Sequence, residues 1–247
     1  MKRLLAAGSG DIYQICKVWR REESGSRHNP EFTLLEYYRV GFSYQRLMQE
    51  TAELLQQLLP QLNRPPQFIA YRDCFLERLQ LDPHLADKDA LQAAARAENL
   101  EVQGELTRQE WLDLLFTHVI EADFAQDRLS FVYHYPAEQA ALAATCSDEH
   151  GHPVAQRFEV YLGRMELGNG YQELTDGAQN AARLQQEQAQ RLAAHQDAIP
   201  VDRHFLAALQ RGLPRCAGIA LGVDRILLCR LGKKALNQVI SFDWELA

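Results

Sequence analysis

One stretch decides the fold of this chain: Arg20-Arg21-Glu22-Glu23-Ser24-Gly25-Ser26-Arg27-His28-Asn29-Pro30-Glu31-Phe32-Thr33-Leu34-Leu35-Glu36-Tyr37-Tyr38. Residues 12–19 before it are rich in β-branched and aromatic side chains, and residues 32–38 at its end alternate with period two. Ser24-Gly25 supplies a turn between the two runs. The stretch therefore predicts an antiparallel hairpin.

Period two also sorts the side chains of this hairpin by face. It places four side chains of the second strand on one side: Phe32, Leu34, Glu36 and Tyr38. Arg20 and Glu22 share a side on the first strand and its extension into the loop. Unpaired buried charge costs roughly several kcal/mol, so these residues do not suit a core. They suit a zwitterionic or phosphorylated ligand.

Composition limits the class of protein. The 247 residues are 47% hydrophobic and 24% charged, which is typical of one globular enzyme domain spanning residues 1–247. No run of about 18 apolar residues is present, so we expect no membrane span and a cytoplasmic location. The five cysteines form no Cys-x-x-Cys pair, which argues against a disulfide framework or a zinc site. A net charge of -7 offers no surplus of cations for nucleic acid.

Three blocks carry a resemblance to a known family. Residues 20–38 contain Arg-x-Glu, Arg-His-Asn-Pro-Glu-Phe-Thr and Glu-x-Tyr, and resemble motif 2 of class II aminoacyl-tRNA synthetases in its lysyl-type version. Residues 158–176 resemble the lysyl-type block of metal-binding carboxylates and amino-acid contacts, and residues 218–225 resemble motif 3. The resemblance implies an α+β catalytic domain, an antiparallel β-sheet flanked by helices. We expect a helical insertion at about residues 64–128.

The resemblance implies ATP-dependent formation of an aminoacyl-adenylate. Arg20 would bridge the substrate carboxylate and the α-phosphate, a task suited to the planar fork of arginine. Arg225 would hold the γ-phosphate and would also be the cation above the adenine ring. Phe32 would stack beneath the adenine, Glu22 would accept from its exocyclic amine, and His28 would contact phosphate. The alternatives are core packing for Phe32 and a simple surface charge for either arginine.

A second pair of residues suits a metal ion. Gly163-Arg164 reads as a two-residue hairpin loop, which places Glu166 opposite Tyr161 and diagonally next to Glu159 on the same side. Adjacent carboxylates repel each other unless a cation lies between them, and oxygen ligands beside phosphates suit Mg²⁺. Glu159 and Glu166 are therefore the predicted metal ligands, with Glu159 also part of the ATP site. A structural, ion-paired glutamate is the alternative.

The amino-acid pocket is predicted from alternation. Asn169, Tyr171 and Glu173 share one face of the strand that follows, and with Glu36 and Tyr38 they form a pocket with acid at its far end. Such a pocket suits a substrate with an ammonium group. By the resemblance, the side-chain amine of a lysine-type substrate would meet Glu173.

Two features suggest the branch of the family. The chain shows no anticodon-binding β-barrel before the catalytic domain, as lysyl-tRNA synthetases have, and residues 131–143 and 216–222 resemble the paralogues that attach (R)-β-lysine to a lysine of elongation factor P. Ala220 stands where the tRNA enzymes have glycine, which changes the depth of the pocket. The implied substrates are (R)-β-lysine or lysine, and the implied partner is elongation factor P rather than tRNA. An enzyme charging tRNA or another acceptor, and an inactive regulatory paralogue, remain as alternatives.

The start of the chain departs from the family pattern. Motif 1 and a Ser-Pro-Glu loop are expected before Met1 and are absent from the sequence. In the family they supply the dimer interface and a contact to the substrate amine. We therefore interpret the chain as truncated at its N-terminus, with a homodimer expected for the full-length protein and a monomeric or aggregation-prone state for these residues alone.

Overall fold

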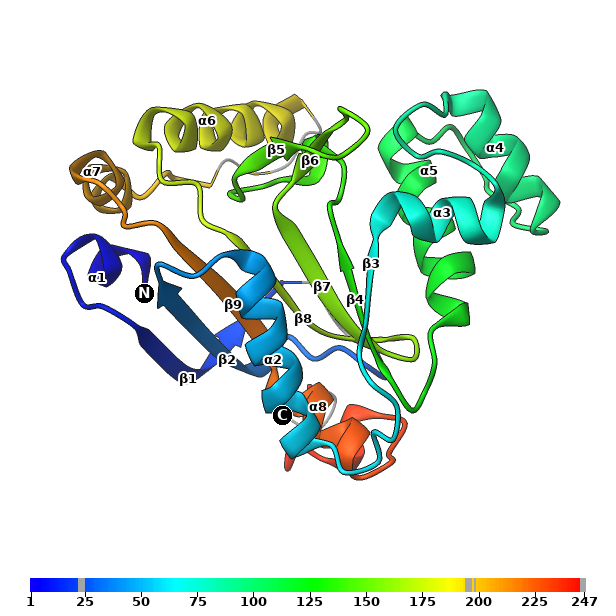
Figure 1. The fold of residues 1–247 in the computed structure, drawn as a ribbon, viewed down its shortest axis with the longest axis horizontal. Helices are drawn as coiled ribbons and strands as arrows, with labels where there is room; N and C mark the ends of the chain where they lie inside the picture. The colour runs from blue at the N-terminus through cyan, green and yellow to red at the C-terminus, as the bar shows by residue number, and fades with distance from the viewer. Residues whose placement is uncertain (22–24, 194–196, 198, 245–247) are drawn as a thin grey trace.

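The computed structural model describes residues 1–21, 25–193, 197 and 199–244. The strands of its main sheet are β1 Ile12–Trp19, β2 Glu31–Val40, β3 Gln67–Ala70, β4 Leu129–Tyr133, β7 Arg157–Leu162, β8 Met165–Gln172 and β9 Cys216–Gly222. They lie in the order β1-β2-β9-β8-β7-β4-β3 (Figure 1). Every neighbouring pair is antiparallel except β3 and β4. The predicted fold class is confirmed.

Helices surround this sheet. They are α1 Lys2–Ala6, α2 Tyr44–Leu58, α3 Tyr71–Leu79, α4 Lys88–Ala97, α5 Arg108–Leu115, α6 Gly177–Ala193, α7 Arg203–Arg211 and α8 Val223–Arg230. A π-helix at Phe116–Ile120 and a 3₁₀ turn at Glu121–Asp123 follow α5, and a small ribbon pairs β5 Thr145–Ser147 with β6 Pro153–Ala155. In the described part of the chain, no helix is long and apolar enough to cross a membrane.

The predicted hairpin forms the start of the sheet. β1 and β2 pair from Ile12 opposite Tyr38 to Trp19 opposite Glu31. Side chains of β1 alternate between half-buried and exposed along its whole length. The alternation of residue types in the sequence thus corresponds to one face that points inward and one that points to solvent.

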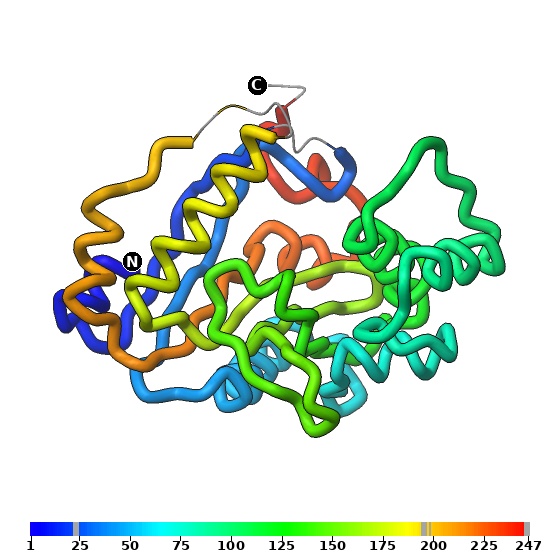
Figure 2. Tube along the Cα trace, turned by 90° about the horizontal axis from the view of Figure 1, so that it is seen from above, coloured from blue at the N-terminus to red at the C-terminus, as the bar shows by residue number. Residues whose placement is uncertain are grey.

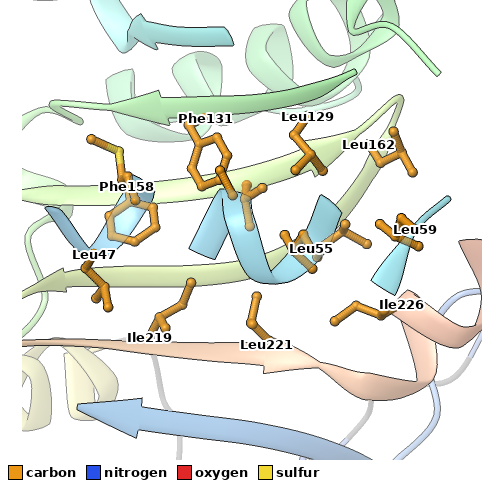
Figure 3. Packing of buried hydrophobic residues seen from close by; sticks show 14 of the residues in the cluster. Leu47, Leu55, Leu59, Leu129, Phe131, Phe158, Leu162, Ile219, Leu221 and Ile226 are labelled. Carbon is orange, nitrogen blue, oxygen red and sulfur yellow. The ribbon is translucent and has the colours of Figure 1, made fainter. Parts of the chain in front are cut away.

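One face of the sheet is closed by α2. The helix begins after Ser43, whose side-chain oxygen accepts a hydrogen bond from the backbone nitrogen of Arg46 at 3.3 Å, a typical N-cap. Its leucines, Leu47, Leu55 and Leu59 at the C-terminal end, are fully buried against β-strand side chains that include Phe158, Ile219 and Leu221 (Figure 3). Each such leucine stabilises the fold by about 1.5–3 kcal/mol. The alternate side chains of each strand project from the opposite face of the sheet.

The segment predicted as a helical insertion lies at one end of the sheet. Helices α3, α4 and α5 gather there beside β3 and β4 (Figures 1 and 2), and they bury a cluster of their own that includes Phe75, Leu91 and Leu112. The segment also contains β3, which joins the main sheet in parallel with β4. The prediction of a helical insertion at about residues 64–128 did not include this strand.

Candidate active site

The face of the sheet opposite α2, here called the site face, brings together predicted residues from four strands. Glu36 on β2 pairs with Ala220 on β9, Ala220 pairs with Asn169 on β8, and Asn169 pairs with Glu159 on β7. Residues that lie opposite each other in antiparallel strands project from the same face. Four side chains that are distant in sequence therefore form one row.

A neighbouring row lies two residues along each strand. Tyr38 and Tyr171 both pair with Gly218, which lies between them on β9. A methyl group built on Gly218 would lie 2.4 Å from the ring atom Cε1 of Tyr38. Glycine is needed at this position because only the missing side chain leaves room for the ring.

A cavity of about 260 Å³ opens at one end of the site face. It is lined by seven of the predicted residues: Arg20, His28, Phe32, Glu166, Asn169, Ala220 and Arg225. Arg27, which was not among the predicted residues, adds a third arginine to the lining. A cavity with three guanidinium groups and an aromatic ring suits a nucleotide with several phosphates.

Arg20 and Phe32 occupy this cavity together. The guanidinium carbon of Arg20 lies 5.6 Å from the ring centroid of Phe32, and the backbone nitrogen of Arg20 donates to the carbonyl oxygen of Pro30 at 2.9 Å. Phe32 belongs to none of the hydrophobic clusters found among the described residues. Core packing therefore does not account for this ring, which remains half-buried at the cavity wall.

Arg225 connects three elements at the cavity. It lies in the first turn of α8, where one guanidinium nitrogen donates to the backbone oxygen of Glu166 at 2.9 Å and to its Oε2 at 3.2 Å. The other terminal nitrogen lies 2.7 Å from Nε2 of His28. Beside it, Oδ2 of Asp224 accepts a hydrogen bond from the backbone nitrogen of Thr33 at 2.7 Å. These contacts hold the helix start, the loop after β1 and the β7–β8 hairpin in one arrangement.

Glu159 is buried and accepts from four donors. Its Oε1 receives hydrogen bonds from Arg157 and from Asn169 at 3.0 Å, and its Oε2 receives them from Tyr135 at 2.8 Å and from Tyr161. A carboxylate offers about four lone-pair sites, so both oxygens are occupied. In this arrangement Glu159 shows the ion-paired geometry of a structural glutamate.

Glu166 is the more accessible of the two predicted metal ligands. Burial and the nearby charge of Glu159 raise its pKa, while the attraction of Arg225 opposes them. Its side chain is 38% exposed, and both glutamates line a second cavity of about 450 Å³ on the side of α5. The described residues contain no group of three or more potential metal ligands. Of the two, Glu166 is the carboxylate that would hold a Mg²⁺ ion, because the lone pairs of Glu159 are taken.

The far end of the predicted amino-acid pocket already holds a cation. The ammonium nitrogen of Lys2 lies 2.7 Å from Oε2 of Glu173 and 3.0 Å from the hydroxyl oxygen of Tyr171. Nearby, the hydroxyl of Tyr38 donates to Oε1 of Glu36 at 2.5 Å. Lys2 was not among the predicted residues, because nothing near it in the sequence points to partners 169 and more residues away.

One predicted residue lies outside this description. Glu22, the proposed acceptor for the adenine amine, falls within residues 22–24, which the structure does not describe. The other predicted residues divide into the cavity that contains Arg20, the glutamate pair beside it, and a group beyond Ala220 that consists of Glu36, Tyr38, Tyr171 and Glu173.

The chain has counterparts among known proteins. Residues 1–244 match the family model for tRNA synthetases class II (D, K and N). The chain belongs to this class of enzymes.

Within the class, three similar relatives are ligases that carry one name. The elongation factor P--(R)-beta-lysine ligase of Pectobacterium carotovorum subsp. carotovorum (strain PC1) is 45% identical over 252 residues, covering 100% of this chain and 75% of the relative. The ligases of Edwardsiella ictaluri (strain 93-146) and Pasteurella multocida (strain Pm70) are each 45% identical, covering 100% and 99% of this chain and 75% of each relative. The chain is thus a member of the elongation factor P--(R)-beta-lysine ligase family, which confirms the predicted resemblance.

Proposed function

We propose that this protein is an ATP-dependent ligase that activates (R)-β-lysine, or lysine, as an aminoacyl-adenylate and transfers it to a lysine of elongation factor P. The main support is that a cavity with three arginines reaches Ala220, and that Glu36 lies opposite Ala220 on the same face of the sheet. The name of the similar ligases supports the choice of acceptor and amino acid. An enzyme acting on this factor would work in the cytoplasm.

The chemistry follows from the lining of the cavity. Arg20 would hold the amino-acid carboxylate against the α-phosphate of ATP and stabilise the charge that develops during attack. The carboxylate oxygen forms a bond to the α-phosphorus, the bond to the bridging oxygen breaks, and pyrophosphate leaves. The neutral amine of the acceptor lysine then attacks the activated carbonyl carbon, and AMP leaves with the electron pair of the broken C–O bond.

The remaining cavity residues would position the nucleotide. Phe32 would stack against adenine, and Arg225 and His28 would contact the outer phosphates, where their mutual contact already places them side by side. Bound Mg²⁺ would supply positive charge to the phosphates, and Glu166 is the ligand that suits it best here. A metal role for Glu159 as well stays a prediction, since it requires Glu159 to exchange at least one of its present donors.

The assembly of the enzyme is a separate part of the proposal. Tyr13, Ile15 and Trp19 project from the exposed side of the edge strand β1 with exposures of 72%, 61% and 70%. An apolar stripe of this kind on a sheet edge is typical of a surface that meets another chain. It supports the expected homodimer. The net charge of -7 supports a protein acceptor rather than tRNA.

The test is an acceptor comparison. Purified protein is given ATP, Mg²⁺ and radiolabelled (R)-β-lysine or lysine, first alone for ATP–pyrophosphate exchange and then with elongation factor P or with tRNA. We expect exchange that depends on the amino acid, and label on the factor. Label on tRNA with none on the factor would refute the proposed acceptor, and no exchange with either amino acid would refute the ligase.

A further inference from the structure

The turn that carries His28 has little packing of its own. Residues 25–28 are exposed, so burial of apolar surface contributes little to their position. Two backbone hydrogen bonds close the turn: the nitrogen of Gly25 donates to the oxygen of His28 at 3.0 Å, and the nitrogen of His28 donates to the oxygen of Gly25 at 3.2 Å. These bonds fix the shape of the turn but not its place relative to the nucleotide cavity.

Residues 235–244, here called the C-terminal segment, reach this turn from the other end of the chain (Figure 2). The backbone nitrogen of Leu236 donates to the oxygen of Ser26 at 2.9 Å, and the backbone nitrogen of Trp244 donates to Oδ1 of Asn29 at 2.9 Å. Asn29 is 9% exposed, and its Nδ2 donates to the oxygen of Glu31 at 2.6 Å. Its side chain therefore links the C-terminal segment to the first residue of β2.

The C-terminal segment is itself anchored in the core. Leu236 is 5% exposed and belongs to the main hydrophobic cluster, and Val239 and Ile240 pack against that cluster. Leu236 also lines both the nucleotide cavity and a neighbouring cavity of about 280 Å³, which residues of the turn and of the C-terminal segment line together. The segment thus gives the exposed turn a fixed reference in the core.

Two residues of the nucleotide cavity lie next to these contacts. Nε2 of His28, the residue before Asn29, lies 2.7 Å from a guanidinium nitrogen of Arg225. The oxygen of Pro30, the residue after Asn29, accepts a hydrogen bond from the backbone nitrogen of Arg20 at 2.9 Å. A displacement of Asn29 would therefore change the positions of both His28 and Arg20.

We propose that the C-terminal segment positions the turn for nucleotide binding, and that the hydrogen bond from the backbone nitrogen of Trp244 to Asn29 is the decisive contact. Trp244 is not among the described residues that line the nucleotide cavity, so it acts through Asn29 and is a positioning residue. This inference rests on the proposed function, because it presupposes ATP in that cavity.

The decisive contact uses the backbone of Trp244 and not its ring. The residue is 60% exposed, so its side chain can be removed at little cost to packing. Trp244→Ala removes the ring and keeps the N–H group, whereas Trp244→Pro removes the N–H group as well. The two variants therefore separate the hydrogen bond from the side chain.

The test is ATP–pyrophosphate exchange by the full chain, with lysine or (R)-β-lysine as the amino acid. We expect Trp244→Pro to raise KM for ATP about fivefold or more, the scale of one hydrogen bond. Its kcat and its KM for the amino acid should stay within about twofold of wild type, as expected when only nucleotide binding is weakened. Trp244→Ala should keep the wild-type KM for ATP, and the melting temperatures of both variants should change little.

A second substitution removes the other partner of the same hydrogen bond. Asn29→Ala should raise KM for ATP at least as much as Trp244→Pro, because it also removes the donor to Glu31. The double variant should be no worse than Asn29→Ala alone, since both substitutions remove one shared contact.

Three results would overturn the inference: a wild-type KM for ATP in Trp244→Pro, an equal rise of KM in Trp244→Ala, or effects of Asn29→Ala and Trp244→Pro that multiply in the double variant. Each of them leaves the proposed function intact, because wild-type protein still exchanges pyrophosphate. If wild-type protein shows no exchange that depends on the amino acid, the proposed function itself fails, and this inference fails with it.

Discussion

Ala220 lies directly opposite Glu36 in the β2–β9 pair, so the methyl group and the carboxylate project from the same face of the sheet. The cavity that contains Arg20 reaches Ala220, but Glu36 is not part of its lining. The methyl group therefore lies between the cavity proposed for the nucleotide and the carboxylate proposed for the amino-acid substrate.

Substitution Ala220→Gly should shift the preference of the enzyme towards α-lysine over (R)-β-lysine. Removing one methyl group relaxes a pocket in which discrimination of that size is worth roughly 1–3 kcal/mol, so we expect a change of about tenfold. ATP–pyrophosphate exchange rates for both amino acids in both proteins give the ratio. An unchanged ratio would place Ala220 away from the substrate.

Substitution Arg20→Ala should lower the exchange rate about a hundredfold, which corresponds to about 3 kcal/mol of transition-state stabilisation. The melting temperature should change little, because the side chain lies at an open cavity rather than in the core. Arg21→Ala is the matched control, since Arg21 is 83% exposed and its contact with Asp197 at 3.9 Å is a surface pair of small value. Near-full exchange in Arg20→Ala would remove Arg20 from the mechanism.

Substitution Gly218→Ala should damage the amino-acid pocket selectively. The added methyl group would lie 2.4 Å from Cε1 of Tyr38, so the ring must move, at a cost of about 1–3 kcal/mol in the free energy of unfolding. We expect lysine binding to weaken much more than ATP binding in paired titrations.

The stability control for Gly218→Ala lies on the same strand. A methyl group on Gly222 would meet side-chain atoms of Arg225 at 3.6 Å, an ordinary contact distance. Gly222→Ala should therefore leave the urea-unfolding free energy nearly unchanged. Equal losses of ATP and lysine binding in Gly218→Ala would indicate general unfolding of the site instead.

The stability of the protein should depend on the ionisation of Glu121. Burial, followed by the charges of Glu159 and Glu166, raises the pKa of Glu121 to about 7. A carboxyl group whose pKa is raised on folding contributes stability that is complete below its ordinary pKa and is lost as the pH rises through the raised value. The contribution should thus disappear between about pH 5 and pH 7.5.

Glu121→Gln should flatten this part of the stability profile. We expect the variant to equal wild-type protein near pH 5 and to exceed it above pH 7, as measured by urea unfolding across the range. Glu53→Gln, at an exposed position on α2, serves as the control and should follow the wild-type curve. A Glu121→Gln profile parallel to that of the wild type would contradict the assignment.

Local patterns in the sequence predict the parts of this structure that depend on neighbouring residues. The β1–β2 hairpin forms at the predicted positions because alternation and a turn are both short-range properties. The β7–β8 hairpin also places Glu166 opposite Tyr161 as predicted. A bulge between Val160 and Tyr161 then shifts the register, so that Asn169 lies opposite Glu159 and donates to it. The extra residue on β8 is Leu167, which Gly168 follows, and a glycine in a strand is only a weak indication of a bulge.

Contacts between residues far apart in the sequence cannot be predicted from local patterns. Lys2 contacts Glu173 only because α1 packs beside the end of β8, and no spacing rule connects residues so far apart. The strand β3 was missed for a similar reason, since its four residues gain strand structure by pairing with β4 across the sheet. Tertiary packing decides both features, and sequence patterns carry little information about it.

The small residues of β9 have a consequence for substrate length. Small residues occupy every second position of β9 on the site face: Gly222, Ala220 and Gly218. Neighbouring members of this series are about 6.8 Å apart along the strand. The first borders the nucleotide cavity, and the last lies between Tyr38 and Tyr171. An amino acid lying over these small residues would place its two ends at fixed positions along β9. Its length would therefore decide whether both ends reach their contacts. A shift in the register of β9 would therefore change which amino acid fits without altering a single charged group.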